Sequence, residues 1–118
     1  MARAVMVSPR FMPWYEAPKH KGAYGKDLIT PENSDAEKLA VRLFHIEPGG
    51  MAEPHSHKVM EHTFYVIKGS LLVICDGEKH QLCEGDIIHI PPGVTHEVYN
   101  TGSEPTVILA SYAPPKDE

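Results

Sequence analysis

The sequence predicts an all-β protein, a sandwich or barrel built from short strands. Eleven prolines and nine glycines in 118 residues favour turns over long helices. Short runs of alternating apolar and polar residues recur between turn-forming residues, with no helical period separating them. A chain of this length holds one domain with a core of its own. We therefore expect a single domain over residues 1–118.

The N-terminal third is expected to be an irregular arm, residues 1–37, followed by a barrel over about 38–113. Residues 4–7 suit a short edge strand. Between residues 9 and 33, prolines and glycines interrupt every periodic pattern. We expect this segment to lie across the barrel or a partner subunit, because it carries aromatic side chains to bury. These are Trp14, Tyr15 and Tyr24.

Residues 38–47 are predicted to form the first long strand. Leu39, Val41 and Leu43 alternate with smaller or polar residues, and Pro48-Gly49-Gly50 is expected to end the strand. The later strands should be short and closely spaced. We expect them near residues 53–57, 61–68, 70–75, 79–83, 86–90, 95–100 and 105–112.

The two cysteines flank a predicted hairpin. Asp76-Gly77 is a strong signal for a two-residue turn, which would set Cys75 opposite Glu78 or His80. Cys83 then lies too far along the opposite strand for a disulfide. We expect both thiols to be reduced.

Charge and hydropathy exclude several classes of partner. The net charge is -5 and there is no basic cluster, so binding to nucleic acid or to an anionic membrane is not expected. No stretch approaches the roughly 20 apolar residues that span a bilayer. The N-terminal apolar run is too short for a signal peptide, so the expected location is cytoplasmic.

Four histidines point to a metal site. His55, His57 and His62 fall close together, and His96 lies in a second block, Gly85 to Asn100. On a strand, a spacing of two places His55 and His57 on the same face. His62 can approach from the neighbouring strand, and His96 from a strand that is adjacent only in a closed barrel. We predict that all four bind one divalent metal ion.

The two histidine blocks resemble the motifs of the cupin superfamily. The first motif is a glycine followed by H-x-H, a glutamate and a second glycine; the second is a glycine followed by P-x-G, a histidine and an asparagine. The matching residues are Gly49, His55, His57 and Gly69, then Gly85, Pro91, Gly93, His96 and Asn100. The resemblance implies a cupin double-stranded β-helix (jelly-roll barrel), a small-molecule substrate and a homodimer.

One position departs from the cupin pattern. Counting back from Gly69 places His62 where cupins usually have a ligand glutamate. Glu61 fits the spacing after His57 but is out of register with Gly69. Strand alternation turns one of these two side chains inward and the other outward. We expect His62 to be the ligand and keep Glu61 as the alternative.

The other histidines are expected to lie outside the ligand set. His20, in a lysine-rich run, should be solvated, and His45 and His80 have no evident partner. His89 could line the pocket or face outward. Phe64 and Val66 share the parity of His62, so they should line the cavity or fill the core. No general base can be named; the candidates are Glu53, Glu61, Tyr65 and His89.

Four neutral imidazoles would leave the charge of the metal uncompensated, which favours an anionic or chelating substrate. Imidazole suits zinc, iron, nickel and, more weakly, manganese. Resemblance to small cupins with an all-histidine site favours manganese or iron. Three functions are consistent with such a site: a dioxygenase-like enzyme, a redox-neutral isomerase acting on a sugar or uronate, or a non-catalytic metabolite- or metal-binding module.

Overall fold

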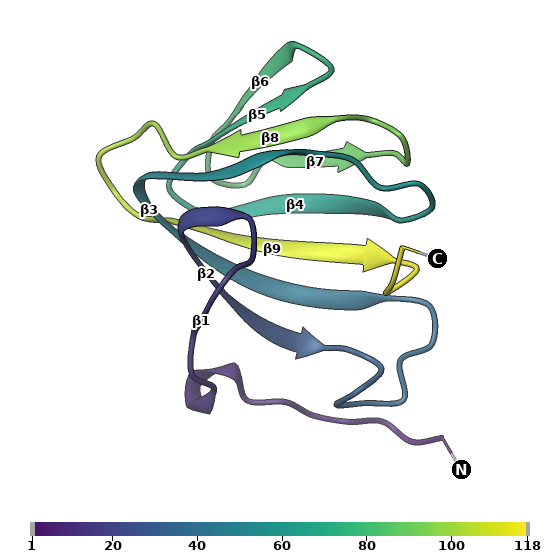
Figure 1. The fold of residues 1–118 in the computed structure, drawn as a ribbon. Helices are drawn as coiled ribbons and strands as arrows, with labels where there is room; N and C mark the ends of the chain where they lie inside the picture. Colours follow the sequence, from purple (N-terminus) through teal and green to yellow (C-terminus); the bar gives the residue numbers. More distant parts are fainter. Residues whose placement is uncertain (1, 118) are drawn as a thin grey trace.

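The computed structural model describes residues 2–117, and most of that backbone is strand, which confirms the all-β prediction (Figure 1). One 3-10 turn, η1 (Pro9–Phe11), precedes the strands. These are β1 (Tyr15–Glu16), β2 (His20–Ile29), β3 (Ala40–His55), β4 (Glu61–Lys68), β5 (Leu71–Cys75), β6 (Glu78–Leu82), β7 (Ile87–Ile90), β8 (His96–Tyr99) and β9 (Thr106–Ala113).

The strands form a single sheet that curls into a nearly closed barrel. Its order is β6-β5-β8-β3-β9-β4-β7, with β2 also paired to β3 and β1 to β2. Strands distant in sequence therefore lie side by side, as Figure 1 shows for β9 between β3 and β4. Every pairing is antiparallel.

The longest strand, β3, changes partners half-way along. Up to Ile46 it pairs with β9, and from Met51 onward it pairs with β8. Between them the chain bends at Gly49, whose φ is +80°, and the Gly49 N–H donates to the Asn100 carbonyl at 2.9 Å. The prediction that Pro48-Gly49-Gly50 ends the strand is therefore wrong, because these residues bend the strand without terminating it.

The prediction of an irregular segment over residues 9–33 is wrong for β2. This strand pairs with β3 from His20 opposite Ala52 to Ile29 opposite Val41. Its buried positions include Ala23 and Gly25, which are too small to produce a visible hydrophobic alternation. Residues 4–7 form no strand.

The remaining strands lie close to their predicted places. β4 has the predicted limits, whereas the strand expected over 53–57 is the end of β3 and stops at His55. Asp76 and Gly77 have φ values of 48° and 82°, as the predicted hairpin requires. Cys75 lies opposite Glu78, and both cysteines are free thiols, as predicted.

The core lies inside the barrel, where alternate residues of each strand point inward. Val66, Leu71, Val73 and Ala110 have no exposed surface. Along β4 the inward positions are His62, Phe64 and Val66, so a buried histidine continues an apolar row. Among residues 2–117, no helix is long and apolar enough to span a lipid bilayer.

Candidate metal centre

Three histidines meet at one end of the β3–β8 pair. His55 is the last residue of β3, and it lies opposite His96, the first residue of β8. His57 follows in the loop after β3. One nitrogen of each ring can be chosen so that all three lie within 4.8 Å of one another. This triad could hold a metal ion.

His62 packs against the same cluster from β4. Its ring centroid is 5.3 Å from that of His57 and 4.7 Å from that of His96. The side chain is only 4% exposed, because β4 is covered by β7 and β9 on its two edges and by the barrel interior on its inner face. The structure thus brings all four predicted histidines together.

Backbone carbonyls orient two of the rings. His55 Nδ1 lies 2.7 Å from the Glu53 carbonyl oxygen, and His96 Nδ1 lies 3.0 Å from the Val94 carbonyl oxygen. Since a carbonyl only accepts, each Nδ1 carries the proton and donates it, which leaves each Nε2 as a lone-pair donor. This is the tautomer in which a histidine binds a metal through Nε2.

Three ring nitrogens in the cluster are buried without a hydrogen-bond partner in the described part of the chain: Nε2 of His96 and both nitrogens of His62. A buried polar atom left unpaired costs about 1–3 kcal/mol. His62 and His96 lie side by side and contact the rings of His55 and His57. A cation bound among these four rings could accept the unused lone pairs.

Burial favours the neutral form of three of these imidazoles, His57, His62 and His96. It lowers the pKa of His62 to about 3, and the neighbouring His96 and His57 add to the effect. Burial is also the main cause that lowers the pKa of His57 and of His96. Neutral imidazole is the form that binds metals, so these three rings could bind an ion at neutral pH without losing protons.

A residue near the C-terminus holds the loop that carries His57. The Asp117 carboxylate accepts hydrogen bonds from the backbone N–H groups of Lys58, Val59 and Met60, at 2.9, 2.7 and 3.0 Å. These bonds lower the pKa of Asp117 to about 2. Its Oδ2 also lies 3.8 Å from Nδ1 of His57. No local pattern in the sequence indicates this contact.

Three of the four clustered histidines, His55, His57 and His62, line a cavity of about 360 Å³, a volume within the range of small-molecule sites. Apolar side chains from β3, β4, β8 and β9 form much of its wall: Phe44, Ile46, Phe64, Val98 and Ile108. Phe64 and Val66 were predicted to line the cavity or fill the core, because they lie on the same face of the strand as His62. Phe64 lines the cavity, and Val66 lies in the core. The predicted solvation of His20 is wrong: it lines the cavity too, stacked on Phe44 with ring centroids 5.9 Å apart.

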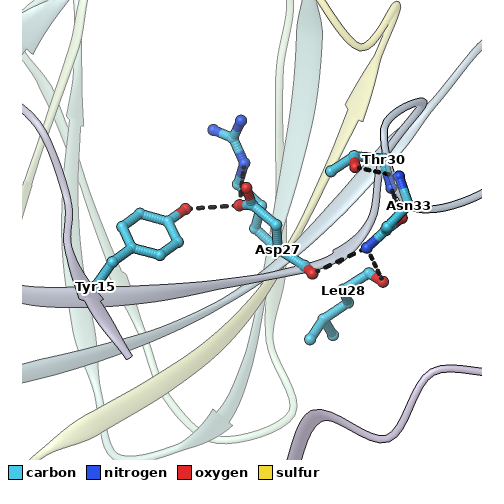
Figure 2. A network of polar contacts seen from close by, with 6 residues as sticks. Tyr15, Asp27, Leu28, Thr30 and Asn33 are labelled. Carbon is cyan, nitrogen blue, oxygen red and sulfur yellow. Dashed lines mark hydrogen bonds and ion pairs between the residues drawn. The ribbon is translucent and has the colours of Figure 1, made fainter. Parts of the chain in front are cut away.

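A polar group occupies another part of the cavity wall. The Tyr15 hydroxyl donates to Asp27 Oδ1 at 2.6 Å, the contact at the centre of Figure 2, and Arg42 Nε lies 3.0 Å from the same oxygen. On the side of Asp27 away from Tyr15, the Asn33 side-chain amide donates to the backbone carbonyls of Asp27 and Leu28 and fixes the end of β2. Burial raises the pKa of Tyr15, and the bond to Asp27 adds to the rise.

The remaining predicted candidates lie away from the cavity. Glu61 points outward and contacts His89 Nε2 at 2.7 Å on the exposed face of β4 and β7. Glu53 and Tyr65 are exposed. His45 and His80 lie beside acidic residues of their own strands or turns. Of the four general-base candidates, none lines this cavity.

Comparisons with known proteins agree with this fold. A family model described as "Cupin domain" matches residues 42–112. An uncharacterised protein, MJ1618 of Methanocaldococcus jannaschii, is 30% identical over 94 residues, 80% of this chain and 75% of its own length. The tetracenomycin polyketide synthase protein TcmJ of Streptomyces glaucescens is 27% identical over 99 residues. This matched region covers 83% of this chain and 66% of TcmJ. The structure of KdgF from Halomonas sp. superposes with a TM-score of 0.84 at 19% identity, covering 98% of this chain and 97% of that one.

Proposed function

This chain belongs to the cupin family, and on that premise we propose that His55, His57, His62 and His96 hold one divalent metal ion in an enzyme active site. The observation that carries the proposal is the set of buried ring nitrogens at His62 and His96 that have no hydrogen-bond partner among residues 2–117. The outward contact of Glu61 with His89 supports His62, and not Glu61, as the fourth ligand. Iron or manganese is the metal proposed, with zinc and nickel also compatible with imidazole.

The metal would supply Lewis acidity, polarising an oxygen atom of the substrate. Because all four ligands are neutral, the bound ion keeps its double charge and favours an anionic substrate or one that chelates through two oxygens. The apolar wall of Phe44, Phe64 and Ile108 excludes water from the rest of the substrate. The substrate proposed is therefore a small, oxygen-rich carboxylate, enolate or diketone.

His20 is the cavity residue best suited to move a proton. Its Nδ1 lies 2.6 Å from the Pro18 carbonyl oxygen, so Nδ1 carries the proton and Nε2 is left as an acceptor. Burial lowers its pKa, which keeps the ring neutral at pH 7. A neutral imidazole in the same cavity as a Lewis acid suits removal of a proton next to a carbonyl group.

We propose redox-neutral chemistry for the site, such as isomerisation, ring opening or cyclisation. A neutral base and a Lewis acid in one cavity suffice for these reactions. TcmJ is named as part of a polyketide synthase, and polyketides are rich in 1,3-dicarbonyl groups that chelate metals. That name supports diketones as a substrate class to test beside hydroxy acids and uronates.

Turnover with and without oxygen tests this proposal. Metal-loaded protein should convert at least one of a panel of uronates, hydroxy acids and 1,3-diketones at the same rate in air and under strict anaerobiosis. Turnover that requires oxygen would assign oxidative cleavage instead. Saturable binding of panel compounds with no metal-dependent turnover would favour a non-catalytic binding module.

We also propose a homodimer. The outer face of β4 and β7 exposes Tyr65, Ile67 and Ile87, and Tyr65 lies opposite Ile87 in the sheet. Three large apolar side chains on one sheet face suit burial against a second copy of the chain. A cytoplasmic location stays a prediction.

A further inference from the structure

Arg42 is a cation in the wall of the same cavity that His55, His57 and His62 line. It projects from β3, opposite Asp27 of β2, and the Tyr112 ring of β9 lies beside it, with its centroid 5.1 Å from Arg42 Cζ. The same Tyr112 ring stacks on His62, with centroids 5.4 Å apart. One tyrosine ring therefore separates the histidine cluster from the guanidinium.

The contacts of Arg42 leave part of its donor capacity unused. Nε is buried and lies 3.0 Å from Asp27 Oδ1, but this ion pair does not satisfy Nε as a hydrogen-bond donor within the described residues. The two terminal nitrogens carry further N–H groups in a planar fork. Asp27 also accepts from the Tyr15 hydroxyl, so its negative charge is shared between two partners.

These contacts hold the guanidinium in place. Tyr15, Asp27 and Tyr112 come from three different strands, and each touches Arg42 or its ion-pair partner. A long arginine side chain that is fixed before a ligand arrives loses little entropy when it binds one. The cavity wall also carries a second cation, Lys19, but no contact of this kind is found for its ammonium group among the described residues. A charged side chain held in place beside apolar wall residues is the arrangement expected of a specificity-determining group.

We propose that Arg42, steadied by Asp27, Tyr15 and Tyr112, forms a second subsite that binds a carboxylate of the substrate while its other end chelates the metal. This inference rests on the proposed metal centre and narrows the substrate class to acids with a chelating hydroxyl or carbonyl at one end and a carboxylate at the other. The spacing of the two ends is set by the Tyr112 ring, which contacts both His62 and Arg42. The carboxylate pairs with the fork of Arg42 in the bidentate manner.

Two probes that differ only in the distal carboxylate test the subsite. 2-Hydroxyglutarate and 2-hydroxyvalerate share the same chelating hydroxy-acid end, and only the first carries a second carboxylate. Titration calorimetry on the metal-loaded protein should give about tenfold or more tighter binding of 2-hydroxyglutarate, the strength of a charge-assisted hydrogen bond. In Arg42→Gln this preference should vanish, while the affinity for 2-hydroxyvalerate stays unchanged.

Two further variants keep the outcome interpretable. Arg42→Lys keeps the charge but loses the fork, so it should keep only part of the preference, and it replaces Arg42→Gln if that variant does not fold. Arg10→Gln removes an exposed arginine outside the cavity lining and should behave as wild type.

Equal affinity of the wild type for the two probes would overturn the subsite, as would a full preference retained in Arg42→Lys or Arg42→Gln. A failure of the metal centre would look different. In that case neither probe would show metal-dependent binding, and the Arg42 variants would have no effect.

Discussion

At the residue scale, His62 is a buried histidine whose ring nitrogens are left without partners, which the proposed metal ion would supply. Its side chain is 4% exposed, and neither ring nitrogen has a hydrogen-bond partner in the chain from 2 to 117. A structural histidine at this position would be expected to donate to a carbonyl, as His55 and His96 do. The apo protein therefore carries a cost at His62 that a ligand removes.

His62→Leu should reveal this conflict. We expect the metal-free variant to be more stable than metal-free wild type by about 1–3 kcal/mol, because an unpaired buried polar group is replaced by an apolar one. Its affinity for the metal should fall sharply. Chemical denaturation and metal titration measure the two effects, with His89→Leu on the outer surface as the control. A destabilised apo variant, or an unchanged metal affinity, would remove His62 from the ligand set.

The pH dependence of stability follows from the same side chain. The folded-state pKa of His62 is lowered to about 3, below the ordinary value of 6.5. Above pH 6.5 neither state binds this proton. As the pH falls from 6.5 towards 3, the unfolded chain binds the His62 proton before the folded protein does. The metal-free protein therefore loses about 1.4 kcal/mol of unfolding free energy for each pH unit in this window. Subtracting the His62→Leu profile isolates this residue, and two parallel profiles would contradict the assignment.

Sequence reasoning located all four clustered histidines but not the residues that support them. The H-x-H spacing predicts His55 and His57 as ligands, and strand alternation counted from Gly69 predicts His62. His20 gave the opposite signal, because its flanking lysines indicate a solvated loop, whereas only its pairing with β3 turns it into the cavity. Arg42 and Tyr15 meet through Asp27, and no local pattern predicts a contact between three separate strands.

At the element scale, the loop between β3 and β4 carries His57 and is tied to the end of the chain. Asp117 accepts three consecutive backbone N–H groups of this loop, and His57 lies next to the first of them. The loop position, and with it the direction of the His57 ring, therefore depends on a residue that follows β9. Removing a hydrogen bond that positions a metal-binding side chain commonly lowers the affinity for the metal.

Asp117→Ala should weaken metal binding by about tenfold or more, the range reported for lost outer contacts of metal ligands. The variant should still bind one ion per chain, because all four imidazoles remain. A competition titration with a chromophoric chelator measures the affinity. Lys116→Ala, which removes a weak contact with Glu32 at 3.9 Å, is the neighbouring control. Equal affinities for the wild type and Asp117→Ala would show that the loop keeps its geometry without this contact.

The elements themselves were predictable where alternation or turn chemistry is strong. β4, with its inward row of His62, Phe64 and Val66, has the limits that its sequence indicates. The Asp76-Gly77 hairpin follows from its dipeptide. β2 and the continuity of β3 were not predictable, because small inward residues and a glycine-containing bend hide a strand from any local pattern. Both are held by long-range pairing.

At the scale of the whole molecule, the outer face of β4 and β7 is the surface proposed for a second copy. Ile87 is 63% exposed, Ile67 48% and Tyr65 40%. Ile87→Lys places a charge on this face and should shift the protein from dimer to monomer in analytical ultracentrifugation. Glu78→Lys, on an exposed position of the β5–β6 hairpin, should leave the dimer intact. A wild-type monomer, or a dimer that survives Ile87→Lys, would contradict the proposed interface.

The central claim is that histidines from three strands and one loop bind a single metal ion. The most direct test is the metal content of the protein purified from its native source, by elemental analysis, compared with His55→Ala, His96→Ala and Glu61→Ala prepared in the same way. The account predicts about one divalent ion per chain in the wild type and in Glu61→Ala, and a loss of most of the metal in both histidine variants. A metal-free wild type, or an equal loss in Glu61→Ala, would contradict it.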